Sequence, residues 1–325
     1  MRDGFNRNIE YIRVSVTDRC NFRCLYCMPA AGVRLLEHAD ILTYEEILRL
    51  LSLLGRAGFR RVRLTGGEPL IRKGFADFVR EVAALRYFED IAVTTNGSLL
   101  AEMAFPLKAA GLKRVNISLD TVNVNRFSHI TGGGKLSRVI EGVEAALLAG
   151  LSPVKLNVVL TDILQQSDIS YFVDLVQTSP VSVRFIEYMP ISQCDVSAGM
   201  SIPALKQTIE TLGGLLTPTS MSYANGPAKY FRLSGSKGTF GFITPISEHF
   251  CGSCNRVRLT ADGKIKPCLL SNQEYDIKTA LRGEISDKNL LRLLERAITA
   301  KPAGHDLVDR MNAPGFCRNM SQIGG

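Results

Sequence analysis

Three cysteines near the amino end of the chain have the residue type and spacing of a metal-binding loop. Cys20, Cys24 and Cys27 follow the pattern Cys-x3-Cys-x2-Cys, directly after the short apolar run of residues 12–16. A [4Fe–4S] cluster takes four protein ligands, so three cysteines leave one iron open for a small chelating molecule. The alternative is a zinc site, which needs a fourth ligand, and His38 is the nearest histidine. We favour the cluster because α/β barrels place their chemistry at the carboxyl ends of parallel strands, where this loop is predicted to lie.

A glycine pair follows the next predicted strand, in the segment Arg-Val-Arg-Leu-Thr-Gly-Gly-Glu-Pro at residues 61–69. Gly66 and Gly67 allow backbone to approach a ligand closely, and Glu68 adds a carboxylate. A glycine pair alone usually marks a turn from strand to helix. Beside the cysteine loop, it indicates a ligand site.

A second cysteine triplet occurs in the last third of the chain. Cys251, Cys254 and Cys268 follow the pattern Cys-x2-Cys-x13-Cys, and His249 lies two residues before the first of them. A zinc site of three cysteines and His249 is therefore a serious alternative to an iron–sulfur cluster. The pattern alone leaves both interpretations open.

Six strand-like runs alternate with helical patterns and must position these loops. Helical periodicity is clear from Tyr44 to Ala57, where Thr43 and Glu46 form a capping box. Repeated βα units predict parallel strands, and six units rather than eight predict a barrel that is open along one side. The strand runs are 12–17, 61–66, 90–96, 114–120, 154–160 and 182–187.

Each predicted strand has one apolar and one polar face, because side chains alternate along a strand. The apolar row must pack under the helices, so the polar row points into the barrel. A structural barrel core prefers branched apolar residues. We therefore expect a polar binding cavity rather than wet edge strands, lined by Arg13, Arg63, Thr94, Ser118 and Lys155.

Composition places the chain among ordinary globular proteins and favours an anionic ligand. The chain has 325 residues, 39 of them basic and 31 acidic, for a net charge of +8. The basic residues are scattered, which favours a phosphorylated small molecule over a nucleic acid. No apolar run approaches the ~20 residues of a membrane span, so no membrane partner is expected. Without a cleavable leader pattern, the expected location is the cytoplasm, where free cysteines serve metals.

The first cysteine loop followed by Gly-Gly-Glu-Pro resembles the radical S-adenosylmethionine (SAM) enzymes. The resemblance implies that the open iron chelates SAM, whose reductive cleavage gives methionine and a 5′-deoxyadenosyl radical. It further implies four residues that bind SAM. These are Tyr26 and Met189 against the adenine, Gly67 at the amino group and Ser118 at the carboxylate.

The second triplet, followed by Asn255-Arg256-Val257-Arg258, resembles the GTP 3′,8-cyclase branch of these enzymes, which opens molybdenum cofactor biosynthesis. The resemblance extends from Tyr11 to the final Gly324-Gly325. It implies two [4Fe–4S] clusters, with the open iron of the second one binding the guanine of GTP. It implies that the radical abstracts the ribose 3′ hydrogen and that the sugar carbon then attacks C8, giving 3′,8-cyclo-7,8-dihydroguanosine triphosphate. The implied GTP contacts are Arg13, Arg63, Thr94, Lys155, Arg256, Val257 and Arg258, and the implied catalytic residues are Arg256, Arg258, Gly324 and Gly325.

We therefore expect an α/β fold, an incomplete (β/α)6 TIM-type barrel over residues 1–190 that holds the first cluster. Residues 191–325 would form a smaller α+β region that closes the open side, with a hairpin over 229–246, one clear helix over 290–300, the second cluster and a Gly-Gly tail. The closest alternative is another radical SAM enzyme with an auxiliary cluster, such as a peptide modifier. Cys194 and Cys317 match no cluster position, and the segment 192–195 departs from the family's pattern.

The expected partners follow from the same resemblance. They are GTP as substrate, an electron donor, and the cyclic pyranopterin monophosphate synthase that receives the product. A homodimer is one option for the assembly, which the sequence leaves open.

Overall fold

The six predicted parallel strands form the centre of one continuous sheet in the computed structural model, which describes every residue except 30, 192–195, 221–225, 306–317 and 325. Each strand pairs in parallel with the next one along the chain, as the βα repeat predicts. Cys194 and Cys317 lie outside the described residues. The six strands are β1 (Tyr11–Ser15), β2 (Arg61–Thr65), β3 (Asp90–Thr95), β4 (Arg114–Ser118), β5 (Val154–Leu160) and β6 (Val181–Glu187).

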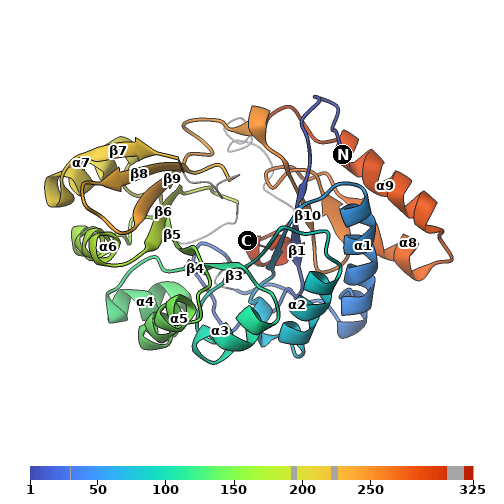
Figure 1. Ribbon diagram of the computed structural model, residues 1–325, viewed down its shortest axis with the longest axis horizontal. Coiled ribbons are helices and arrows are strands. Elements are labelled where there is room, and N and C mark those ends of the chain that lie inside the picture. Colours follow the sequence, from blue (N-terminus) through green and yellow to red (C-terminus); the bar gives the residue numbers. More distant parts are fainter. Residues whose placement is uncertain (30, 192–195, 221–225, 306–317, 325) are drawn as a thin grey trace.

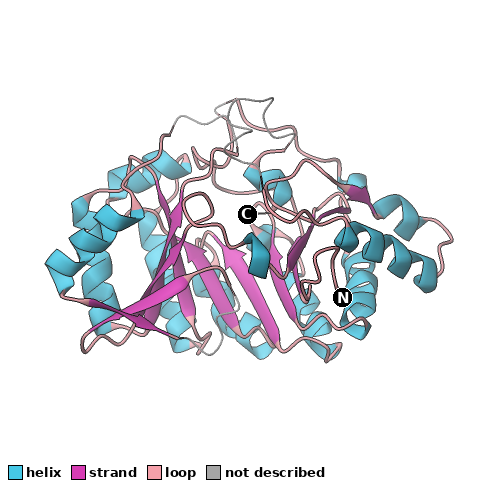
Figure 2. Ribbon diagram, turned by 90° about the horizontal axis from the view of Figure 1, so that it is seen from above, coloured by secondary structure: helices cyan, strands magenta, loops and turns pink. Residues whose placement is uncertain are grey.

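Helices cover the outer face of the curved sheet, on which the apolar row of each strand is buried (Figures 1 and 2). The capping box of Thr43 and Glu46 is present at the start of the first helix. Its apolar stripe buries Ile47, Leu50 and Leu54, a period that keeps one face on the sheet. The helices are α1 (Tyr44–Arg56), α2 (Phe75–Ala84), α3 (Leu100–Ala109), α4 (Val124–Thr131), α5 (Leu136–Leu148) and α6 (Gln166–Thr178). Single 3-10 turns are η1 (His38–Asp40), η2 (Pro69–Ile71) and η3 (Cys251–Ser253).

Strands from the carboxyl-terminal region extend both edges of this sheet. In one group, β9 pairs in parallel with β6. In the other group, β10 pairs in parallel with β1. The strand order is β12-β11-β10-β1-β2-β3-β4-β5-β6-β9-β8-β7, so the two end strands β12 and β7 do not pair and the barrel stays open between them. The added strands are β7 (Leu216–Thr219), β8 (Lys229–Leu233), β9 (Thr239–Ile243), β10 (Arg256–Leu259), β11 (Lys264–Lys266) and β12 (Tyr275–Asp276).

The expected hairpin over 229–246 is confirmed as the antiparallel pair β8 and β9. The expectation of one clear helix in this region is wrong, because α7 (Ile202–Gly213) and α8 (Lys278–Arg282) accompany α9 (Asp287–Thr299). In α7 an N-cap at Ser201 and a proline in the first turn start a helix whose buried face holds only Ile202, Leu205 and Ile209. That short apolar pattern is weak in the sequence. None of the described helices is long and apolar enough to span a membrane.

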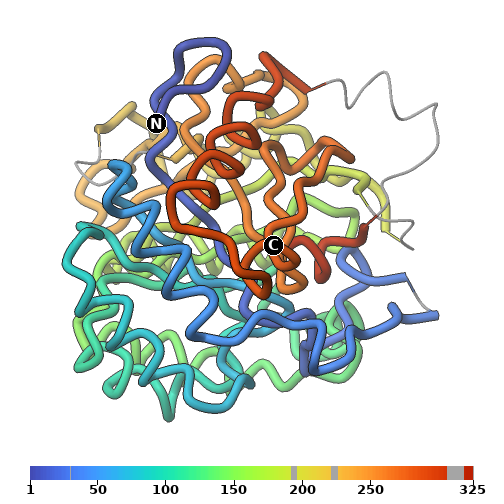
Figure 3. The backbone as a smooth tube through the Cα atoms, turned by 90° about the vertical axis from the view of Figure 1, so that its right-hand side faces the viewer, coloured from blue at the N-terminus to red at the C-terminus, as the bar shows by residue number. Residues whose placement is uncertain are grey.

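The last described residues return to the inside of the arc of strands. The short helix α11 (Met320–Ile323) packs its Ile323 against Ile191 and Leu270. In Figures 1 and 2 the carboxyl terminus lies in the middle of the molecule, on the concave side of the sheet. Figure 3 shows the orange and red carboxyl-terminal segments beside the blue amino-terminal strand, as the pairing of β10 with β1 requires.

Candidate active site

The first cysteine loop leaves the carboxyl end of β1 and is tied to the end of α4. The backbone N–H groups of Arg23 and Leu25 donate to carbonyls of Thr131 and Ile130, at 2.9 Å each. The Cys27 N–H donates to the Cys24 carbonyl, also at 2.9 Å, which closes the turn between these two ligands. Both triplets consist of free thiols, each half-buried. The loop thus presents three sulfur atoms from one tightly folded segment, which fits the ligand set of a cluster with one open iron.

The glycine pair at the end of β2 locks onto this loop. The Gly67 N–H donates to the Thr17 carbonyl at 2.7 Å, and the Glu68 N–H donates to the Arg19 carbonyl at 2.8 Å. A Cβ on Gly67 would lie 2.3 Å from the Arg19 carbonyl oxygen, so no side chain fits there. The sequence predicts that backbone at Gly67 approaches a ligand closely. In the structure, the Gly67 backbone packs closely against the backbone of the cysteine loop.

Glu68 connects the ends of three strands. Its buried carboxylate accepts hydrogen bonds from the Leu70 N–H, the Thr95 hydroxyl and the Asn96 N–H, at 3.0, 2.8 and 2.6 Å. Burial raises the pKa of Glu68 to about 7, although these three donors oppose the shift. The Asn96 side chain donates to the Asn21 side chain at 2.8 Å and lies 3.9 Å from the Cys20 sulfur. Glu68 therefore positions a polar group at the first cysteine.

Two of the four predicted SAM-binding residues lie at the end of β4, on the same edge as the first triplet. The Tyr26 hydroxyl donates to the Asp120 carboxylate at 2.8 Å, and burial raises the Asp120 pKa to about 6. Ser118 ends β4 and is only half-buried. Met189 instead lines the central cavity and packs with Ile191 and Leu270 near the chain end. The structure thus groups Tyr26, Gly67 and Ser118 around the carboxyl ends of β1 to β4, and Met189 follows the carboxyl end of β6 and lines the cavity.

The second triplet lies at the opposite end of the parallel strands, where β1 and β10 begin. Cys254 precedes β10, whose first residue Arg256 is in register with Tyr11, the first residue of β1. The first triplet follows the last residue of the five-residue strand β1. Because a strand rises about 3.3 Å per residue, roughly 13 Å along the strand separates the two triplets. The inside of the barrel lies between the triplets. Cys251, Cys254 and Cys268 all line its cavity, which has a volume of about 220 Å³.

Basic side chains near the second triplet favour the thiolate of Cys254. Burial opposes ionisation of Cys254, but the charges of Arg256 and Lys301 outweigh it and lower the Cys254 pKa to about 7. Lys301 is buried after α9, and its ammonium donates to the carbonyls of Arg256 and Pro267, at 2.9 and 2.7 Å. In contrast, burial raises the pKa of Cys20 to about 11. Cys254 is therefore more readily deprotonated than Cys20, whereas burial raises the pKa of Cys251.

Three arginines stand side by side between the triplets. Arg13 on β1 is in register with Arg258 on β10 and with Arg63 on β2. All three line the cavity, as does Arg184 on β6. Burial, and for Arg13 also the charges of Arg258 and Arg63, lowers the pKa of these guanidinium groups. Such a row of like charges is costly without a counter-ion, and it matches the bidentate recognition of phosphate.

A second row of polar side chains runs across β3, β4 and β5. Thr94, Asn116 and Lys155 are in register on β3, β4 and β5. The Lys155 ammonium donates to the Tyr230 hydroxyl at 3.1 Å. Burial, and then the charges of Arg184, Arg114 and Arg63, lowers the Lys155 pKa to about 6. Thr94 and Lys155 thus share the polar face with the arginines, as predicted, without lining the cavity itself.

Val257 lies on the other face of β10. Its side chain is buried in the hydrophobic core, while Arg256 and Arg258 line the cavity. Strand alternation dictates this arrangement. Any contact of Val257 with a ligand would have to come from its backbone.

The chain end reaches the arginine row. Arg258 donates to the Gly324 carbonyl at 2.5 Å. Gly324 has φ +86°, and a Cβ there would lie 2.9 Å from the Ser15 Cβ and 3.1 Å from the Thr65 Cγ2. Only glycine fits this position without strain. The predicted catalytic residue Gly325 lies outside the described residues.

Four cavity or barrel residues were not among the predicted site residues. Arg184 and Asn157 lie on the polar faces of predicted strands, so their alternation could have identified them. Tyr230 lies on β8, which adds to the sheet two strands from β6, and Lys301 follows α9 in a stretch without a pattern. These two positions depend on the tertiary fold and leave no local signal.

Comparison with known proteins places the two halves of the chain in two family profiles. Residues 14–176 match the Radical SAM superfamily, and residues 181–307 match Molybdenum Cofactor Synthesis C. The chain is 48% identical over 330 residues to a GTP 3′,8-cyclase of Heliobacterium modesticaldum and 49% identical over 327 residues to one of Moorella thermoacetica. Each alignment covers 100% of both chains.

Solved structures show the same fold at low sequence identity. Streptococcus suis SuiB bound to S-adenosylmethionine has a TM-score of 0.65 at 14% identity, covering 97% of this chain and 77% of that one. The structure named anSMEcpe with bound AdoMet has a TM-score of 0.55 at 15% identity, covering 86% of this chain and 82% of that one. At such identity the likeness concerns the fold alone.

Proposed function

The chain belongs to the GTP 3′,8-cyclase family of radical SAM enzymes, and we propose how its own residues carry out that reaction. It is an enzyme that converts GTP to the 3′,8-cyclised nucleotide with two [4Fe–4S] clusters and SAM, the first step of molybdenum cofactor biosynthesis. The alternative of a peptide-modifying radical SAM enzyme is not favoured, because full-length identity to the cyclases far exceeds that to SuiB.

We assign the first triplet to the cluster that binds SAM. When bound, this cluster and SAM supply an electron and a 5′-deoxyadenosyl radical. Cys20, Cys24 and Cys27 hold the cluster, and the Glu68–Asn96 contact keeps a polar group beside Cys20. Tyr26, Gly67, Ser118 and Met189 are the proposed contacts of SAM. At the carboxyl ends of the strands, these residues would hold SAM next to the inside of the barrel.

We assign the second triplet and the arginine row to GTP. Cys251, Cys254 and Cys268 hold a cluster at the amino edge of the barrel, with an open iron for the guanine. Arg13, Arg63 and Arg258 neutralise the triphosphate together with Lys155, while Arg256, Val257 and Thr94 complete the contacts. GTP bound through its guanine and its triphosphate would present its ribose toward the carboxyl edge of the barrel. Fixed geometry of this kind lowers the entropic part of the activation barrier.

One observation carries this assignment: Arg258 on β10 contacts Gly324, is in register with Arg13, and lines one cavity with all three cysteines of the second triplet. A variant in which Cys20, Cys24 and Cys27 are all serine tests it, because only the second cluster can then form. Loaded anaerobically with iron and sulfide, it should bind about four irons per chain. Titration with GTP should change the spectrum of that cluster. A cluster spectrum that GTP leaves unchanged would refute the assignment.

We further propose the context of the reaction. An external electron donor reduces the first cluster, and the product passes to the cyclic pyranopterin monophosphate synthase. The cytoplasm suits both the free thiols and the nucleotide substrate. Residues 1–190 would form the barrel with the first cluster, and residues 191–325 the region with the second cluster and the Gly-Gly tail, so that both regions contribute contacts to GTP. A homodimer is the assembly we would test first, by sedimentation.

A further inference from the structure

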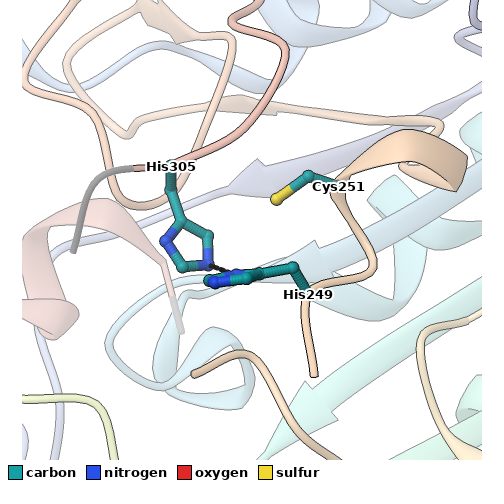
Figure 4. Close-up of side chains that lie close together, drawn as sticks. All are labelled: His249, Cys251 and His305. Carbon is teal, nitrogen blue, oxygen red and sulfur yellow. Dashed lines mark hydrogen bonds between the residues drawn. The ribbon is translucent and has the colours of Figure 1, made fainter. Parts of the chain in front are cut away.

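Two histidines far apart in the sequence converge on Cys251, the first cysteine of the second triplet. One ring nitrogen from His249, one from His305 and the Cys251 sulfur all lie within 4.8 Å of one another. Figure 4 shows the two imidazole rings beside the thiol, with the edge of one ring toward the other. The reaction proposed above uses Cys251 and neither histidine.

The spacing of the two ring nitrogens matches a mononuclear metal site, and the Cys251 sulfur lies near enough to reach the same ion by a rotation of its side chain. His249 Nδ1 and His305 Nε2 are 3.1 Å apart. A tetrahedral zinc site has Zn–N bonds of about 2.0–2.1 Å, which places two bound nitrogens about 3.3 Å apart. Two imidazoles and one thiolate are a borderline-soft ligand set that suits Zn²⁺. His249 is exposed, so a fourth position remains accessible to water.

The backbone around the three ligands is held by contacts that need no metal. Arg7 donates to the Cys251 carbonyl at 2.8 Å and to the Ala303 carbonyl at 3.0 Å, which ties the cysteine to the segment that carries His305. The protonated His305 Nε2 donates to the Pro245 carbonyl at 2.8 Å, on the loop that leads to His249, and this hydrogen bond is lost when the same nitrogen binds a metal. Glu187 accepts from the N–H groups of Ile246 and Ser247 and anchors that loop to β6. The ligand group is therefore arranged before any ion binds.

We propose that His249, Cys251 and His305 form a site for a single thiophilic divalent cation of the Zn²⁺ class in chains that lack the second cluster. The cation replaces the proton between the two imidazoles and the proton of the thiol. Because a cysteine that ligates this ion cannot also ligate the cluster, the two occupancies exclude each other. Zinc at this site therefore blocks insertion of the second cluster and leaves the first triplet untouched.

The test removes the other two ligands of the second cluster and keeps the proposed site. A full-length C254S/C268S variant, with its first triplet filled by iron and sulfide, is titrated anaerobically with Co²⁺ as a coloured substitute for Zn²⁺. We expect one Co²⁺ per chain with a thiolate charge-transfer band. The variant C251S/C254S/C268S is the blank and should show no such band.

Histidine variants on the C254S/C268S background identify the ligands. H249Q and H305Q should each weaken Co²⁺ binding at least tenfold. H129Q, which changes an exposed histidine on α4, is the matched control and should leave binding unchanged. Equal Co²⁺ affinity with and without His249 and His305, or equal binding by the blank, would overturn the proposal.

A second measurement uses the natural cysteines and does not depend on the folding of the serine variants. Cluster-free chain exposed to one equivalent of Zn²⁺ and then to iron and sulfide should take up about four irons instead of about eight. The H249Q/H305Q variant should take up about eight under the same conditions. If zinc blocks iron uptake equally in both chains, the histidines do not form the site.

Discussion

At the scale of single residues, the barrel interior concentrates positive charge that only an anion can balance. The row of Arg258, Arg13 and Arg63 carries this charge, and Lys155 can add to it when it is protonated. Strand alternation predicted Arg13, Arg63 and Lys155 from the sequence, because the opposite faces are apolar, whereas Arg258 was implied by the family resemblance. The contacts of Tyr230 and Lys301 could not be predicted, since they depend on how β8 and the segment after α9 fold back.

If Lys155 contacts GTP as proposed, we expect it to make GTP binding dependent on pH. Burial and neighbouring arginines lower its pKa to about 6, so in the ligand-free chain it is mostly neutral above that pH. A bound triphosphate favours the ammonium form, and binding between pH 7 and 8.5 should therefore take up one proton. GTP affinity should fall by up to about tenfold per pH unit as the pH rises.

Calorimetry in buffers of different ionisation enthalpy measures that proton uptake. K155M should lose it and should bind GTP more weakly by about 1.5–3 kcal/mol, the value of a hydrogen bond to a charged group. Proton uptake that persists in K155M would show that another group titrates.

At the scale of elements, the loops at the strand ends support one another. The glycine pair after β2 hydrogen-bonds to the cysteine loop after β1, and Glu68 connects both to the end of β3. The sequence indicated that these loops share an edge, because parallel strands end together. It did not reveal that the second triplet lies at the opposite edge, since that depends on β10 pairing in parallel with β1.

Replacing Glu68 tests this connection. In E68Q an amide N–H₂ must face one of three donors that the carboxylate now accepts from. The free energy of unfolding should fall by about 1–3 kcal/mol, the cost of leaving a buried polar group unpaired. Denaturant unfolding measures the change, and E81Q on exposed Glu81 is the control. A loss in E68Q no larger than in E81Q would contradict this role.

The tail is a second element whose position is specific. An alanine at Gly324 meets Ser15 and Thr65 and needs the left-handed backbone that glycine alone adopts freely. Overpacking of about 1–3 kcal/mol should displace the tail and lower the cyclisation rate about ten- to a hundredfold. Iron content should stay unchanged, as it should when Gly324 and Gly325 are deleted.

G283A is the control for that substitution, because a Cβ at Gly283 makes only ordinary contacts. Product formation by G324A at the rate of G283A would show that the tail is not needed in this position.

At the scale of the whole molecule, the carboxyl-terminal region completes the sheet rather than standing beside it. It supplies the neighbour of β1 at one edge and the neighbour of β6 at the other. The sequence predicted a region that closes the open side of the barrel, and its hairpin was visible as a pattern. The long-range pairing that divides it between two edges had no local signal.

This continuity predicts that residues 1–190 do not fold alone. Both parallel edges of the six-stranded sheet would be exposed, together with apolar surface that Val257, Leu259 and Phe240 now cover. The fragment should be insoluble or lack a cooperative thermal transition, while the full chain melts in one step. A fragment with a cooperative transition of its own would show two independent domains.

The most direct test of the account is an anaerobic assay of the chain loaded with both clusters, with SAM, GTP and a reductant. Chromatography and mass spectrometry follow 5′-deoxyadenosine and the nucleotide product. The account predicts equal amounts of 5′-deoxyadenosine and 3′,8-cyclised dihydroguanosine triphosphate, and neither product when the first triplet is serine. Absence of 5′-deoxyadenosine, or its release without any cyclised nucleotide, would contradict it.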